Sequence, residues 1–162
     1  MKCLCFSDSH GSSALMRRAL AMHRDAEVVF FLGDGLSDAY EIVSENPTRA
    51  FYLVRGNCDI GGAYSNIEKT LFLNIMNKKI ALTHGDLYGA KGGLGGLVSL
   101  AVREKCDIVL FGHTHEPLER YDSERELHLF NPGSISERYS GRSFGIITLA
   151  EDSVLFSHGC VF

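Results

Sequence analysis

Short apolar segments alternate with helical patterns in this chain, and the alternation constrains the fold more than any other feature of the sequence. Four such segments occupy residues 2–6, 28–32, 50–54 and 108–111, and they are rich in β-branched and aromatic residues. Segments of this kind are typical of strands that are buried on both faces. Strands that alternate with helices predict right-handed crossovers between parallel strands. We therefore expect a parallel sheet in the first part of the chain.

Three helices are expected, two of them between the first three strands. Ser12 or Ser13 can cap the first helix, and Ser37 can cap the second, because a serine hydroxyl accepts a hydrogen bond from a free backbone N–H. A third helix is expected over residues 94–104, directly before the apolar segment at residues 108–111.

The later part of the chain has a different pattern. Residues 71–75 and 79–83 flank a polar turn, and residues 144–149 and 154–156 flank another, which is typical of antiparallel hairpins. Residues 127–130 form one more short apolar segment. The sum is a mixed α/β protein with two sheets or one strongly bent sheet, and we expect residues 1–162 to form a single domain.

Composition excludes several classes of protein. A formal charge of −4 and a pI near 5.9 provide no basic surface for duplex nucleic acid. No apolar run approaches the roughly 20 residues of a membrane span, and no signal-peptide stretch follows the N-terminus, so we expect a cytoplasmic protein that binds no membrane. The five cysteines include no C-x-x-C pair, which argues for reduced thiols.

Five of the expected strands end in a glycine-bearing corner that also carries a metal-binding type of residue. The corners are Asp8-Ser9-His10-Gly11, Gly33-Asp34-Gly35, Gly56-Asn57-Cys58-Asp59, His84-Gly85-Asp86 and Gly112-His113-Thr114-His115. One such corner alone would be an ordinary turn. Side chains at the carboxyl ends of neighbouring strands converge, however, so five corners in this order indicate one shared site.

The residue types at these corners favour divalent metal ions. Carboxylate, imidazole and amide groups suit Mn²⁺, Fe²⁺, Ni²⁺ or Zn²⁺ without a thiolate. Seven candidate ligands are too many for one ion: Asp8, His10, Asp34, Asn57, His84, His113 and His115. Two ions about 3.5–4 Å apart that share one carboxylate would use the whole set, and this is the geometry of an in-line phosphoryl displacement.

At these residues the sequence resembles the calcineurin-like metallophosphoesterase superfamily, whose pattern runs D-x-H, G-D, G-N-H-[DE], H-G and G-H-[ST]-H. The short chain and the G-N-C-D variant are similar to the small single-domain prokaryotic phosphodiesterases of that superfamily. The resemblance implies a four-layer α/β/β/α sandwich of two mixed sheets. It also implies a dinuclear metal site at the rim.

The resemblance further implies a role for each candidate ligand. Asp8, His10, Asp34 and His115 would hold the first ion, and Asp34, Asn57, His84 and His113 would hold the second, so that Asp34 bridges. A hydroxide that bridges the two ions, most simply two Mn²⁺, would attack a small phosphodiester substrate. Asn57 and His113 would serve catalysis, and Asn57 and Arg138 would contact the phosphate.

Cys58 marks a departure from the wider superfamily. It stands in place of the histidine that, in many relatives, helps to protonate the leaving group, so we count it among the candidate catalytic residues. A thiol with a pKa near 8.5 is a doubtful proton donor, and a small packing residue is the alternative.

Two other functions remain open at this point. One is a phosphomonoesterase or nucleotide phosphatase. The other is a non-catalytic scaffold, because a eukaryotic trafficking-complex subunit resembles this fold; a scaffold should have lost ligands, whereas all seven are present here. The glycine-rich residues 88–96 are either a lid over the site or a tight connection, and the sequence is compatible with a homo-oligomer.

Overall fold

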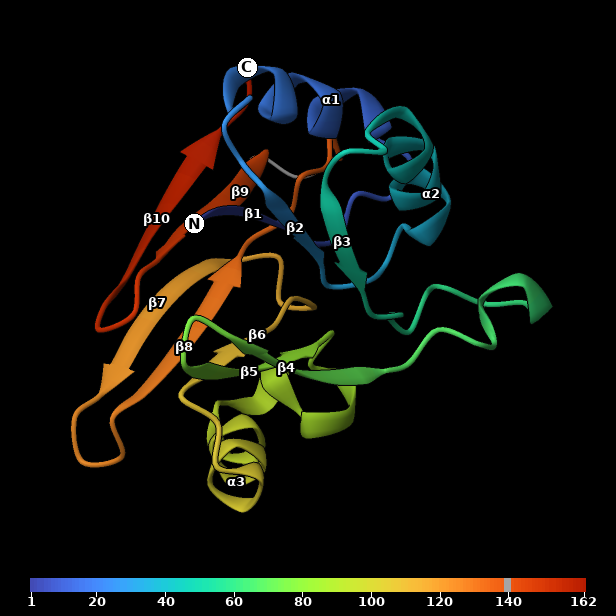
Figure 1. Ribbon diagram of the computed structural model, residues 1–162. Coiled ribbons are helices and arrows are strands. Elements are labelled where there is room, and N and C mark those ends of the chain that lie inside the picture. The colour runs from blue at the N-terminus through green and yellow to red at the C-terminus, as the bar shows by residue number, and fades with distance from the viewer. Residues whose placement is uncertain (139–140) are drawn as a thin grey trace.

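Two five-stranded sheets form the centre of the protein in the computed structural model, which describes residues 1–138 and 141–162 (Figure 1). The first sheet has the order β10 (Val154–Cys160), β9 (Ser143–Leu149), β1 (Lys2–Phe6), β2 (Val28–Phe31) and β3 (Ala50–Leu53). Strands β1, β2 and β3 are parallel, as expected, whereas β9 runs antiparallel to β1 and to β10.

The second sheet is also mixed. Its order is β4 (Thr70–Ile75), β5 (Lys78–Thr83), β6 (Ile108–Leu110), β8 (Leu127–Pro132) and β7 (Pro117–Asp122). The pairs β4/β5 and β7/β8 are antiparallel hairpins, and β6 lies parallel to both β5 and β8. The parallel strands β5 and β6 therefore end at the same edge of this sheet.

Helices cover the outer face of each sheet (Figure 1). Helices α1 (Ser13–Met22) and α2 (Leu36–Glu45) lie on the first sheet, and α3 (Gly95–Glu104) lies on the second. Three short 3-10 helices, η1 (Gly62–Tyr64), η2 (Asp86–Tyr88) and η3 (Ala90–Gly92), lie in the connections. The layers confirm the expected four-layer α/β/β/α sandwich.

Successive side chains of a strand point to opposite faces of the sheet. The apolar core therefore forms three clusters, one between each two adjacent layers. In β1, Leu4 packs toward α1 and α2, whereas Cys3 and Cys5 pack between the two sheets. In β6, Val109 packs toward α3 while Ile108 packs between the sheets. Both faces of these strands are thus buried, which explains why their sequences are continuous runs of apolar residues.

Two helix starts differ from the sequence prediction. Helix α2 begins at Leu36, so Ser37 lies inside its first turn and does not cap it. Ser12 stands at the start of α1 but caps no backbone group there, and its Oγ accepts a hydrogen bond from the N–H of Glu137 instead. Strand β7 was not predicted, because its sequence is polar and mostly exposed.

No helix in the described part of the chain is long and apolar enough to cross a membrane.

Candidate metal centre

The five corners meet where β1, β2 and β3 of one sheet and β5 and β6 of the other reach their carboxyl ends. The backbone there is unusual: ten non-glycine residues among those described have a positive φ, and half of them are candidate ligands, namely Asp8, His10, Asp34, His113 and His115. This region of backbone space costs non-glycine residues energy, and such residues gather at functional sites. The fold thus holds these side chains in orientations that a regular strand would not give.

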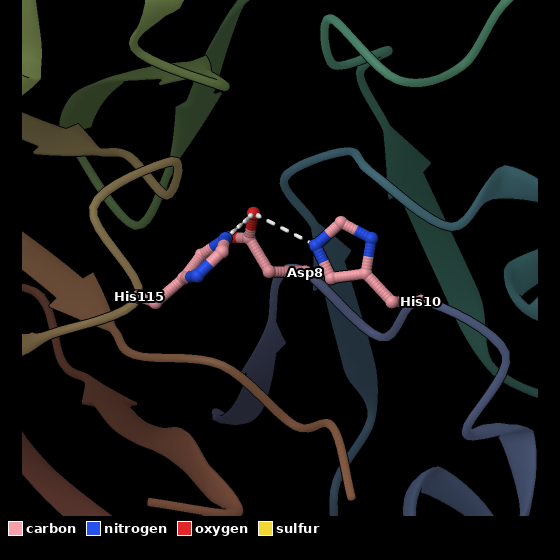
Figure 2. A group of neighbouring side chains, drawn as sticks. All are labelled: Asp8, His10 and His115. Atoms are coloured by element: carbon pink, nitrogen blue, oxygen red, sulfur yellow. Dashed lines mark ion pairs between the residues drawn. The ribbon is translucent and has the colours of Figure 1, made fainter. Parts of the chain in front are cut away.

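Asp8 is the centre of a first group of candidate ligands. Its buried Oδ1 lies 3.0 Å from Nε2 of His115 and 3.8 Å from Nε2 of His10, with the two imidazoles on opposite sides of the carboxylate (Figure 2). Its Oδ2 accepts hydrogen bonds from the Ser7 hydroxyl and from the N–H of His113. Within the described residues, Oδ1 receives no hydrogen bond. A buried carboxylate oxygen without a donor is costly, so this atom is suited to a cation.

His84 is the centre of a second group. Its Nδ1 donates a hydrogen bond to the Leu32 carbonyl at 2.7 Å. Nε2 therefore faces the other candidate ligands: it carries the lone pair when the ring is neutral and donates to Asp34 when the ring is protonated. Nε2 lies 3.1 Å from Oδ1 of Asn57, 3.2 Å from Nδ1 of His113 and 3.3 Å from Oδ2 of Asp34. Several electron-pair donors therefore converge on one point, as the ligands of a metal ion do.

The two groups adjoin each other. Nε2 of His84 is 3.9 Å from Oδ1 of Asp8, and ligand atoms of Asp8, Asp34 and His84 all lie within 4.8 Å of one another. Asp34 also belongs to a set with His10 and Cys58 at the same spacing. The structure thus brings all seven predicted ligands together, and Asp34 reaches both groups.

Buried charge shifts the pKa values at this site. Burial alone would raise the pKa of Asp34, but hydrogen bonds from His84 and from the N–H of Cys58 outweigh burial and lower it far below its usual value. Burial lowers the pKa of His84, but Asp34 and Asp8 together raise it overall. The pKa of His113 is lowered by its burial and by the charges of His84 and Lys91. The Asp34 carboxylate thus stays ionised and can balance the charge of divalent ions.

Asp59 joins two corners of the site, a role that the sequence did not reveal. Its carboxylate accepts hydrogen bonds from the N–H groups of Asp34, Gly35, Leu36 and Gly56 at 2.8–2.9 Å. It therefore caps the N-terminus of α2 from a different loop and fixes the Asp34 corner against the Asn57 corner. A Cβ at Gly56 would collide with the Asp34 carboxylate, which explains the glycine.

Asp38 and Ser134 support the Asp8 corner. Asp38 in α2 accepts hydrogen bonds from the Ser9 hydroxyl at 2.6 Å and from the N–H of Gly11 at 2.8 Å. The Ser134 hydroxyl donates to the Asp8 carbonyl at 2.7 Å. The sequence offered only one signal for such residues, which is a polar residue close to a glycine-bearing corner.

Asn131 supports the histidine corner after β6. Its amide donates to the Gly112 carbonyl at 2.9 Å and to the Thr114 hydroxyl at 3.0 Å. A side chain of the neighbouring strand β8 therefore fixes the backbone of the corner that carries His113 and His115.

Two predicted features remain, Arg138 and the glycine-rich residues 88–96. Arg138 is exposed on a turn, and its backbone N–H donates a hydrogen bond to the Ser136 hydroxyl. The glycine-rich residues 88–96 fold largely into η2, η3 and the start of α3, and the N–H of Ala90 donates to the Gly85 carbonyl. A tight connection, rather than an open loop, describes this segment.

Comparisons with known proteins identify the family of the chain and similar folds. The sequence profile of the calcineurin-like phosphoesterase superfamily domain matches residues 1–153. A probable metallophosphoesterase of Bacillus subtilis, YsnB, is 33% identical and aligns over 94% of this chain and 87% of its own length. The phosphodiesterase YfcE of Escherichia coli is 28% identical and aligns over 91% of this chain and 87% of its own length. A crystal structure of a predicted phosphoesterase from Streptococcus pneumoniae superposes with a TM-score of 0.79 at 23% identity. The superposition covers 97% of this chain and 87% of that protein.

The chain belongs to the calcineurin-like phosphoesterase superfamily. The donor set and the buried Oδ1 of Asp8 fit divalent metal ions, as this membership implies.

Proposed function

We propose that this protein hydrolyses phosphodiesters with the help of two divalent ions, most simply Mn²⁺. The observation that carries the proposal is the pair of adjoining ligand groups that meet at Asp34. The similarity to a relative named a phosphodiesterase supports the choice of substrate class. The ions would lower the pKa of an attacking water and neutralise charge on the phosphoryl oxygens.

The protein's own contribution is to fix each ligand before substrate arrives. The Leu32 carbonyl fixes the tautomer of His84. The Asn57 side chain donates its N–H to Sγ of Cys58 at 3.3 Å, which turns Oδ1 toward His84 and the second position. In this proposal Asn57 and His113 serve catalysis, Asn57 also contacts the phosphate, and Arg138 pairs with the phosphate from the exposed turn. Ligands that are already in place need no reorganisation during the reaction.

Charge balance favours a diester over a monoester. Two dications, the carboxylates of Asp8 and Asp34, an attacking hydroxide and a diester monoanion sum to zero formal charge. A monoester dianion would leave one negative charge in excess. The nearby carboxylates of Asp38 and Asp59, which accept hydrogen bonds from neutral hydroxyl and backbone donors, add negative charge and therefore do not favour a monoester dianion.

The Cys58 thiol is unsuited to attack on phosphorus. Burial, a hydrogen bond to Asp34 and the surrounding carboxylates raise its pKa to about 11 in the metal-free protein, so the thiol is protonated at neutral pH until a metal ion binds. We therefore propose a water molecule as the nucleophile.

A cavity of about 550 Å³ next to the histidine corner offers room for the organic part of a substrate. Its wall includes Thr114, between His113 and His115, and Lys91, whose charge acts on His113. Phe111, Leu94 and Leu118 give it an apolar surface. A nucleoside or aryl group is the chemical class that suits this wall.

The test is hydrolysis of bis-(p-nitrophenyl) phosphate and of p-nitrophenyl phosphate after reconstitution with Mn²⁺. We expect the diester to be preferred and a chelator to abolish activity. Asn57→Ala and His113→Ala should each lower kcat/KM by about 10²-fold. His128→Ala, a histidine outside the site, is the control. A preference for the monoester would replace the proposed diesterase with a phosphatase, and wild-type rates in both ligand variants would overturn the ligand assignment.

A further inference from the structure

Cys58 lies where a metal ligand would lie, although the family pattern gives it no such role. Its Sγ, a ring nitrogen of His10 and a carboxylate oxygen of Asp34 are all within 4.8 Å of one another. The proposed first ion would use the same His10 and Asp34. We propose that Cys58 supplies a thiolate ligand at this position when the ion is thiophilic, such as Zn²⁺, Co²⁺ or Cd²⁺.

The spacing suits coordination by sulfur. Bonds from zinc to sulfur and to nitrogen are about 2.3 Å and 2.0–2.1 Å, so the ligand atoms of one tetrahedral ion stand about 3.5 Å apart. The three ligand atoms lie within 4.8 Å of one another, so side-chain movements of about 1 Å bring them to this spacing. Cys58 is exposed and turns about a single side-chain bond, so it can make that adjustment without moving the backbone.

The surroundings of Cys58 keep the sulfur close to the site. The N–H of Cys58 donates to Oδ1 of Asp34 at 2.7 Å, which ties this residue to the shared carboxylate. The amide of Asn57 donates to Sγ at 3.3 Å. The sulfur is therefore in contact with one candidate ligand, Asn57, and within 4.8 Å of a carboxylate oxygen of another, Asp34.

An independent observation also points to a cation at this place. Oδ1 of Asp8 is fully buried, receives no hydrogen bond from the described residues and lies 3.8 Å from Nε2 of His10. A thiophilic ion bound by His10, Asp34 and Cys58 would also be near this oxygen. On binding, the S–H bond breaks, a sulfur–metal bond forms, a bound water leaves the ion and the proton passes to solvent.

Thiolate ligation would make the site sensitive to the kind of metal. Soft thiolates select zinc and similar ions, whereas oxygen and nitrogen ligands suit Mn²⁺. A thiolate also occupies a coordination position that water would otherwise take. Resting on the proposed function, this inference predicts that Cd²⁺ and Zn²⁺ inhibit the hydrolysis that Mn²⁺ supports.

The experiment is a titration of the metal-free protein with Co²⁺, followed by absorption in the near ultraviolet, where a cobalt–thiolate bond gives a charge-transfer band. We expect the band in the wild type and in Cys160→Ser, which removes the other exposed cysteine, and no band in Cys58→Ser. Cd²⁺ affinity should fall by about tenfold or more in Cys58→Ser, with a much smaller change for Mn²⁺. Circular dichroism checks folding, and Cys58→Ala is a second variant.

A band that persists in Cys58→Ser, or a wild type that binds Co²⁺ with no band, would overturn the inference. Its failure is distinguishable from failure of the proposed function. Hydrolysis with Mn²⁺ and no cobalt–thiolate band would reject only the role of Cys58. A band that depends on Cys58, in a protein that hydrolyses no diester, would support the ligand and reject the function.

Discussion

The two ligand groups of the site differ in how firmly the fold holds them. In the group around His84, the imidazole is 0% exposed and Asp34 is 3% exposed. The imidazole donates a hydrogen bond to the Leu32 carbonyl, and the Asp34 carboxylate accepts one from the N–H of Cys58. In the group around Asp8, the imidazoles of His10 and His115 are 15% and 22% exposed. Each group has members of the other kind, since Asn57 is exposed and Asp8 is buried. The imidazole at the centre of the proposed second position is nevertheless fixed by the backbone before an ion binds, whereas the imidazoles of the proposed first position lie nearer to solvent. We expect the ion at the second position to be held more tightly.

The largest effect is expected from Asp34→Ala, because this carboxylate serves both groups. Hydrolysis of a phosphodiester should fall by about 10³-fold, since both ions lose a ligand at once. Steady-state kinetics at several Mn²⁺ concentrations measure this loss of activity. If excess Mn²⁺ restored most of the activity, Asp34 would not be shared.

A comparison of His84→Ala with His10→Ala tests the difference between the groups directly. His84→Ala should lower kcat by about 10²-fold at any Mn²⁺ concentration, because it empties a buried position and leaves the Leu32 carbonyl without its donor. His10→Ala should cost about tenfold and recover partly with added Mn²⁺, because its position is open to solvent. Equal losses in the two variants would argue that the positions are equivalent.

Smaller effects are expected at the residues that support the corners. Asp59→Ala removes the acceptor of four backbone N–H groups around Asp34, so Mn²⁺ affinity should fall by about 10- to 100-fold and stability by about 2 kcal/mol. Asp38→Ala disturbs only the Asp8 corner, and its effect on affinity should be smaller. Calorimetric titration with Mn²⁺ and thermal unfolding check both. A smaller loss of affinity in Asp59→Ala than in Asp38→Ala would reverse the comparison.

Much of this arrangement could be predicted from the sequence. Apolar strands with residues such as Leu4 and Phe30 buried on opposite faces predict a sheet covered on both sides, and the order of the corners indicates where their ends converge. The supporting contacts could not be predicted. Asp59 lies next to Cys58 in sequence, but its partners at Gly35 and Leu36 come from another loop, and only tertiary structure brings them together.

The cap of α2 could not be predicted from the sequence for the same reason. Local pattern favoured Ser37, a residue type that often begins helices, whereas the fold supplies the Asp59 carboxylate from a distant corner. Strand β7 was missed because an exposed edge strand needs no apolar alternation.

The count of bound ions tests the central claim most directly, which is that two adjoining positions share Asp34. Elemental analysis of protein saturated with Mn²⁺ and freed of excess metal should give two ions per chain in the wild type, and clearly fewer at both positions in Asp34→Ala. A brief exposure to chelator should leave one ion in the wild type, held by the buried group around His84. A wild type that binds only one ion at saturation, or an Asp34→Ala variant that still binds two, would contradict the account.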